Sequence, residues 1–144
     1  MKKQFIRVVL NGNKYYIDRE ADYAGWADNP GWDRTYPTIA VLGGMKNTQN
    51  SLDTFIHECL HGCDGSAYEP MVTQTAKNAA ALLWNEGLRY YVRPVKVTNS
   101  VRKFVRGAIM AVLTGCNCKW DKLKIDVTAR DIAAAAVKVG YRLK

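Results

Sequence analysis

Both histidines of the chain lie in one short segment, Asp53 to Asp64, with the sequence DTFIHECLHGCD. His57 and His61 are four residues apart, and Glu58 directly follows the first of them. In a helix, positions i and i+4 lie on the same face, one turn apart. Two imidazoles in this arrangement can hold one metal ion, and the intervening carboxylate can reach a water molecule on that ion. Zinc-dependent hydrolysis requires such a donor set, with one coordination position left open.

The apolar residues of the segment indicate that the histidines face away from the core. At about 100° per residue, the two histidines lie within about 40° of each other on the helix surface. A core helix with two incidental surface histidines is the alternative. Chance placement of this spacing with an adjacent glutamate has a frequency of roughly 4 in 10,000, so the metal interpretation is favoured. The apolar stripe lies between about 200° and 300° from His57 and consists of Leu52, Ile56, Cys59, Leu60 and Cys63.

The third metal ligand must be a carboxylate, a cysteine or water, because the chain has no further histidine. Glu69 is preferred, since it opens the next predicted helix, which must pack back against the first after a short turn. Its alternative role is to complement that helix dipole. Asp64 has a suitable azimuth but lies about 10 Å along the axis from His57. It could bind the metal only if the helix unwinds at Gly62. Otherwise we expect the Asp64 carboxylate to accept from the ring N–H of a histidine whose other nitrogen binds the metal.

The four cysteines are expected to be free thiols. Cys59 and Cys63 lie on the core side of their helix, and Cys116 and Cys118 are separated by one residue, whereas structural zinc sites usually have two to four. The first residues are a poor match to a signal peptide, which predicts a cytoplasmic protein in which disulfides are rare. No apolar run reaches the roughly 18 residues that a membrane span requires, so we expect no membrane contact.

Turn residues and hydrophobic periodicity predict an α+β fold with a small antiparallel or mixed sheet packed on helices. Asn11-Gly12 favours a type I′ turn in an N-terminal hairpin. A third strand, Thr38–Leu42, follows Pro37, which suits either a strand start or a sheet edge. We expect this strand to provide an edge on which an extended peptide docks. Residues 21–35 are expected to form a loop that breaks at Asn29-Pro30-Gly31, and residues 89–99 a linker or short extended piece. Helices are expected at about 52–63, 69–87, 100–113 and 128–139. The expected N-caps are Ser51 or Asn50 for the first helix, Ser100 for the third and Thr128 for the last, and Asp53 is expected to complement the dipole of the first helix.

The positive charge of the chain is concentrated in its last third. Residues 1–85 contain 8 Lys/Arg and 9 Asp/Glu, whereas residues 86–144 contain 13 and 4. We therefore expect a metal-binding core at 1–95 and a basic two-helix extension at 96–144 that packs on it. The basic helices favour either a solvated lysine-rich surface or contact with a polyanion such as nucleic acid. The solvated surface is the preferred interpretation, because no nucleic-acid-binding motif accompanies the charge.

The sequence LDTFIHECLHGCD resembles the active-site helix of zincin metallopeptidases, in particular the small HExxH proteins of phages and bacteria of the minigluzincin or SprT-like type. The resemblance covers about residues 36–88, and the chain departs from it at Pro70 and Thr73, where acidic residues are commoner. This leaves Glu69 as the one carboxylate at the start of the second helix. The second part of the pattern is matched by Glu69, Val72, Ala76, Ala80, Leu83 and Trp84.

The resemblance implies a zinc metallopeptidase that hydrolyses a protein or peptide substrate. His57 and His61 would bind Zn²⁺, Glu69 would be the third ligand, and Glu58 would be the general base. Two alternatives remain open at this point. One is a non-enzymatic nucleic-acid-binding or regulatory protein whose zinc site is vestigial or structural, and the other is zinc-dependent hydrolysis of a non-peptide amide.

Overall fold

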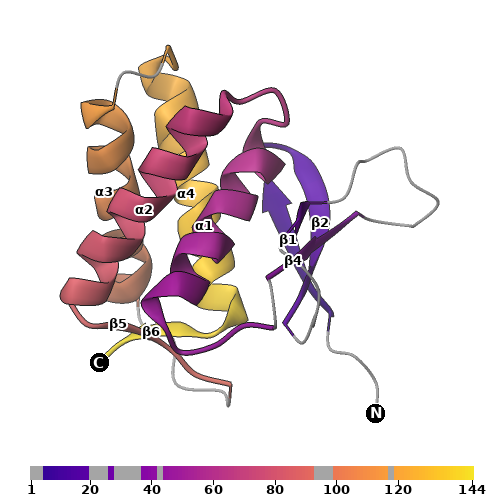
Figure 1. Cartoon of the computed structure of the whole chain (residues 1–144), viewed down its shortest axis with the longest axis vertical. Coiled ribbons are helices and arrows are strands. Elements are labelled where there is room, and N and C mark those ends of the chain that lie inside the picture. Colours follow the sequence, from indigo (N-terminus) through magenta and orange to yellow (C-terminus); the bar gives the residue numbers. More distant parts are fainter. Residues whose placement is uncertain (1–4, 20–25, 28–36, 42–43, 93–98, 117–118) are drawn as a thin grey trace.

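The computed structural model describes residues 5–19, 26–27, 37–41, 44–92, 99–116 and 119–144. Within these ranges the chain forms helices and two small sheets, so the α+β prediction is confirmed (Figure 1). The helices are α1 (Gln49–Cys63), α2 (Glu69–Asn85), α3 (Asn99–Gly115) and α4 (Lys122–Val139). The strands are β1 (Phe5–Leu10), β2 (Asn13–Asp18), β3 (Trp26–Ala27), β4 (Thr38–Ala40), β5 (Leu88–Tyr90) and β6 (Tyr141–Leu143).

The larger sheet has the strand order β1-β2-β4-β3. Strands β1 and β2 form the predicted hairpin, in which Leu10 pairs with Asn13. The two turn residues, Asn11 and Gly12, have φ angles of 51° and 84°, as a type I′ turn requires. Strand β2 then pairs in parallel with β4, so the sheet is mixed.

The prediction that the third strand is a sheet edge is wrong. Strand β4 is covered on both sides, because Ile39 pairs with Ile17 of β2 and with Ala27 of β3. The segment predicted as a loop contains β3, which is only two residues long and therefore has no alternating pattern to reveal it. Leu42 and the predicted break at 29–31 lie outside the described residues.

Three predicted helix caps are also wrong. Helix α1 begins at Gln49, and Thr48 caps it by accepting from the Ser51 N–H at 3.1 Å. Helix α4 begins at Lys122, where Asp121 accepts from the Lys124 N–H, and Thr128 is buried inside the helix. Ser100 likewise lies within α3 rather than before it. Polar side chains in a first turn and at a cap look alike in sequence, so the periodic pattern placed these starts too late.

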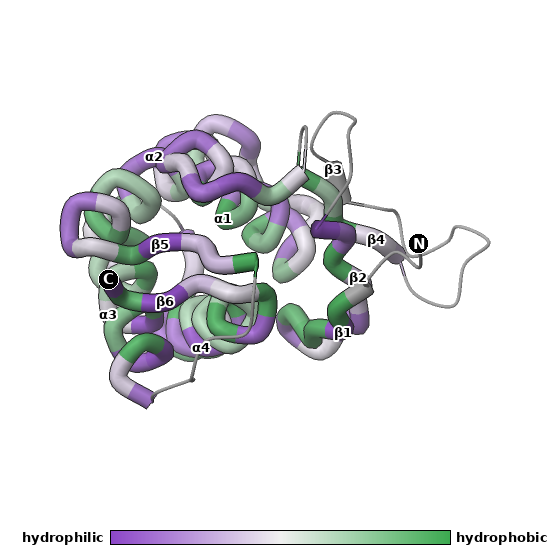
Figure 2. Tube along the Cα trace, turned by 90° about the horizontal axis from the view of Figure 1, so that it is seen from below, coloured by the Kyte–Doolittle hydropathy of each residue, from purple (hydrophilic) through white to green (hydrophobic). Residues whose placement is uncertain are grey.

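Helix α1 lies at the centre of the molecule, between the sheet and the other helices (Figures 1 and 2). It packs on the sheet and against α2 and α4, while α3 covers α2 and α4. Buried side chains from both sides of the predicted boundary at residue 95 belong to one hydrophobic cluster. Strands β5 and β6, which come from opposite sides of that boundary, pair with each other. None of the helices in the described ranges combines the length and the apolar character that a bilayer span requires.

Candidate metal centre

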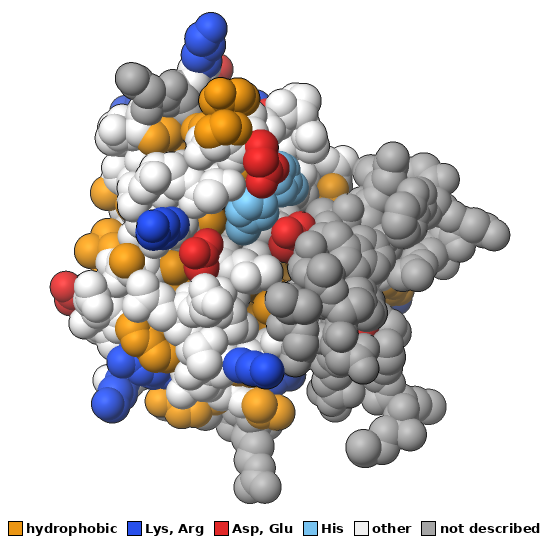
Figure 3. Space-filling model, in the orientation of Figure 1, with side chains coloured by type: hydrophobic (Ala, Val, Ile, Leu, Met, Phe, Trp, Pro, Cys, Tyr) orange, Lys and Arg blue, Asp and Glu red, His pale blue; other side chains and the backbone are white. Residues whose placement is uncertain are grey.

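Helix α1 presents its two histidines together at the surface. The opposite face of the helix is buried, with Ile56 and Leu60 at 1% and 0% exposure. The side chains of His57 and His61 are each 21% exposed, and their ring centroids lie 4.9 Å apart. Figure 3 shows both imidazoles at the surface with acidic side chains beside them. The predicted orientation of the histidines, away from the buried stripe, is therefore present in the fold.

Glu69 reaches the histidines because the chain turns tightly between α1 and α2. The Asp64 carboxylate accepts from the Ser66 N–H at 2.9 Å, and the Asp64 carbonyl accepts from the Ala67 N–H at 3.1 Å. This turn places the first residue of α2 beside α1. One carboxylate oxygen of Glu69 lies 2.9 Å from Nε2 of His57, and the other lies 2.7 Å from Nε2 of His61.

The three side chains are arranged as a metal site would need them. One ligand atom from each lies within 4.8 Å of the others. Tetrahedral zinc with bonds of about 2.0–2.1 Å holds its ligand atoms roughly 3.3 Å apart, so only a small adjustment would be required. Two imidazole nitrogens and one carboxylate oxygen are a donor set that zinc prefers. The Glu69 side chain is 60% exposed, which leaves a side of the site open to water or substrate.

Glu58 lies beside the cluster without contributing an atom to it. Its side chain is buried, and the residue is 8% exposed. Burial raises the pKa of Glu58 to about 7, and the negative charge of Glu69 adds to this effect. A cation held by the neighbouring side chains would act in the opposite direction and favour the carboxylate.

Asp53 is a neighbour of the site that the sequence pattern assigned to another role. It was expected to complement the N-terminal dipole of the helix, but α1 starts at Gln49 and its first turn contains no acidic residue. Asp53 instead lies one turn before His57. Burial raises its pKa, while the positive charges of His57 and Lys77 act against that shift. Asp53 lies four residues before His57 in the sequence, and this spacing predicts that the two side chains share a face of the helix.

Asp64 is held away from the metal cluster. Helix α1 ends regularly at Cys63, without unwinding at Gly62, and Asp64 is its extended C-cap residue. The Asp64 carboxylate pairs with Lys124 of α4 and accepts from the Ser66 hydroxyl at 2.7 Å. These hydrogen bonds lower the pKa of Asp64. Asp64 therefore ties the end of α1 to α4, and it does not belong to the group formed by His57, His61 and Glu69.

The cysteines described in the structure are free thiols, as predicted. Cys59 and Cys63 are buried on the core side of α1, and Cys116 is partly exposed. Burial raises the pKa of Cys63 to about 12, so this thiol stays protonated and is a poor metal ligand. Cys118 lies outside the described residues.

Five of the 13 basic residues in residues 86–144 have ion-pair or backbone-carbonyl partners in the described part of the protein. Three form ion pairs and two donate to backbone carbonyls, which orients these side chains but leaves the segment with a net positive charge. The ion pairs are Arg106 with Asp126, Lys124 with Asp64 and Arg130 with Asp131, and the carbonyl contacts are made by Arg89 and Arg142.

Comparisons of the chain with protein-family models, with curated proteins and with solved structures find no match. Its function must therefore be inferred from the geometry and chemistry of its own residues.

Proposed function

We propose that the protein is a zinc-dependent peptidase whose metal is bound by His57, His61 and Glu69. The observation that carries this proposal is the position of Glu69. Its two carboxylate oxygens lie within hydrogen-bonding distance of the Nε2 atoms of both histidines, although Glu69 belongs to a different helix. Three potential ligand atoms from two helices thus converge at a partly exposed place, next to a second carboxylate, that of the buried Glu58.

Zinc bound there would lower the pKa of a water molecule toward about 7 and polarise a substrate carbonyl. Glu58 carries out the proton transfers that the reaction requires. Glu58 accepts the proton from the attacking water and later donates it to the leaving amine. Its burial keeps competing water away from the carboxylate, and α1 fixes its position beside the two ligands.

The excess of basic residues after residue 86 favours a second candidate function, nucleic-acid binding with a zinc site that is vestigial or structural. A gel-shift assay with random-sequence DNA at low and high salt separates the two functions, because phosphate contacts weaken steeply as salt rises. A salt-sensitive shift with no peptidase activity would favour the second function.

The proposed function is tested by the substitution Glu58→Gln in zinc-loaded protein, with an unfolded protein such as labelled casein as the substrate. Zinc content should stay unchanged, and the rate should fall by about 10²–10⁴-fold, the usual contribution of a general base. Glu86→Gln is the matched control, because Glu86 is exposed at the end of α2 and lies outside the metal group. Equal cleavage by the Glu58→Gln variant and the parent would exclude Glu58 as the base.

A further inference from the structure

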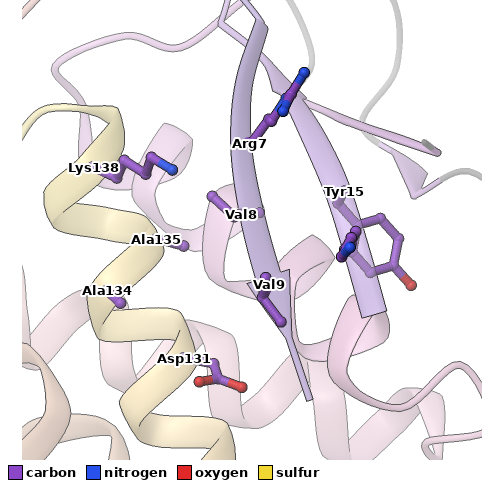
Figure 4. A pocket seen from close by; sticks show the side chains of 9 residues that line it. Arg7, Val8, Val9, Tyr15, Asp131, Ala134, Ala135 and Lys138 are labelled. Atoms are coloured by element: carbon purple, nitrogen blue, oxygen red, sulfur yellow. The ribbon is translucent and has the colours of Figure 1, made fainter. Parts of the chain in front are cut away.

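A cavity lies away from the metal centre, between the N-terminal hairpin and α4. It has a volume of about 380 Å³ and contains none of the metal-site residues. Figure 4 shows it between β1 and the last two turns of α4. We call it the hairpin–α4 pocket and define it by Val8, Val9, Ala134 and Ala135, which form its apolar wall, and by Arg7, Lys14 and Lys138, which supply its positive charge.

The pocket exists because α4 has small side chains where it faces the hairpin. Ala134 is exposed, and Ala135 is buried against the core. On the facing strand, Val9 is 52% exposed, one of the few large apolar side chains in the described ranges that remain so open. A larger residue at position 134 would fill this space. The apolar wall therefore offers a ligand a place to bury a hydrocarbon or aromatic body.

The charges around the pocket favour an anion. Arg7, Lys14 and Lys138 come from β1, β2 and α4, so three separate segments contribute one positive charge each. Asp131 is the one carboxylate among the lining residues. It already accepts from the Asn11 N–H at 2.8 Å and from Arg130 Nε at 3.2 Å. The lining thus has an excess of positive charge, which disfavours a cationic ligand.

Two of the positive charges, Arg7 and Lys138, are separated from Asp131 along the pocket, whereas Lys14 pairs with Val9 across the hairpin. In Figure 4, Arg7 and Lys138 lie toward one end, and the Lys138 side chain points from α4 toward β1. Asp131 lies toward the other end, seven residues earlier in the same helix, which is about 10 Å along its axis. A ligand with an anionic head and an apolar tail matches this polarity, with its head near Lys138 and its tail between Val9 and Ala134.

We propose that the hairpin–α4 pocket binds a small amphiphilic carboxylate, a molecule with one carboxylate and an apolar chain or ring. A nucleic-acid strand fits the site less well. The one aromatic residue of the lining, Tyr15, is 4% exposed and donates its hydroxyl to the Gly62 carbonyl, so it offers no face on which a base could stack. The proposal does not depend on the metal centre or on its activity.

The test is a titration of isotope-labelled protein with decanoate below its micelle concentration, followed by amide chemical shifts. Decanoate should bind saturably and shift the amides of Val8, Val9, Ala134 and Ala135, both with zinc and after chelation. Decanol, which has the same chain without the charge, should bind at least about tenfold more weakly. Equal binding of decanol, or the absence of saturable shifts at these amides, would overturn the proposal.

Two variants and one control separate the contributions of shape and charge. Ala134→Phe should fill the pocket and abolish decanoate binding, and because position 134 is exposed the fold should be retained. Lys138→Glu should weaken binding by about tenfold or more. Lys103→Glu, which changes an exposed lysine of α3 outside the pocket, should leave binding unchanged. Unchanged decanoate binding by the Ala134→Phe variant would contradict the assigned site.

An oligothymidylate titration provides the competing outcome. If this strand shifts the same amides at lower concentration than decanoate, and Ala134→Phe does not affect that binding, the surface is a phosphate-binding groove and the proposal is wrong. If the strand leaves these amides unmoved at physiological salt, the small carboxylate remains the ligand class that the pocket accepts.

Discussion

Substitution of Gly62 by alanine tests how closely α1 is seated on the sheet. A Cβ atom at this position would lie 2.7 Å from Cδ1 of Leu10, 3.3 Å from Cδ1 of Ile39 and 3.5 Å from Cε2 of Tyr15. The Leu10 side chain is fully buried and cannot swing into solvent. The added methyl group must therefore move either the hydrophobic cluster or the helix.

The magnitude follows from two opposing contributions. Replacing a helical glycine by alanine stabilises a helix by about 0.5–1 kcal/mol. Overpacking a filled core costs typically about 1–3 kcal/mol. The contacts around Gly62 close three directions at once, so the second contribution should be larger. We expect Gly62→Ala to lower the free energy of unfolding by about 1 kcal/mol.

Gly107→Ala is the matched control, since Gly107 lies inside α3 and a Cβ atom there would meet nothing within 4 Å. This variant should be more stable than the parent by about 0.5–1 kcal/mol. Urea unfolding followed by circular dichroism measures both variants under the same conditions. If Gly62→Ala stabilises the protein as much as Gly107→Ala does, the close packing of α1 on the sheet is refuted.

Three further predictions concern the site and the end of α1. His57→Ala should lose bound zinc, as elemental analysis of dialysed protein would show, and full retention would exclude His57 as a ligand. Glu69→Gln should keep the fold but weaken zinc binding by about 10-fold or more, because a neutral amide is a poorer zinc ligand than a carboxylate; a competition titration with a zinc-sensitive dye measures this, and unchanged affinity would exclude Glu69. Asp64→Asn should lower stability at pH 7 by about 1 kcal/mol, because it removes the charge that pairs with Lys124. The pKa of Asp64 is lowered in the folded state, so its contribution is present above the unfolded pKa of about 3.9 and is lost as pH falls through the folded value. The difference between parent and variant in urea unfolding should therefore shrink below about pH 4, and a difference that grows there would contradict the assigned pairing.

The features that could be predicted from the sequence are those that depend on local periodicity. The positions of His57 and His61 on one helical face follow from their spacing and from the apolar residues between them. Glu69 could be anticipated because a short turn forces consecutive helices to pack together. The hairpin followed from Asn11-Gly12, whose conformational preference acts within a few residues.

The features that were missed depend on contacts between distant segments. Strand β3 is too short for a pattern, and it is defined by pairing with β4. Strand β6 is defined by pairing with β5, far earlier in the chain. Asp64 was expected to bind the metal only if the helix unwinds, and otherwise to hold a histidine, but its carboxylate pairs with Lys124, sixty residues away. No local rule predicts such a partner, because it is selected by the packing of α4 against α1.

A crystal structure of the zinc-loaded protein, with anomalous diffraction measured at the zinc absorption edge, tests the central claim most directly. We expect one strong anomalous peak bonded to Nε2 of His57, Nε2 of His61 and a carboxylate oxygen of Glu69, with Glu58 beside it and not coordinated. A peak at other residues, or none between these three side chains at saturating zinc, would contradict it.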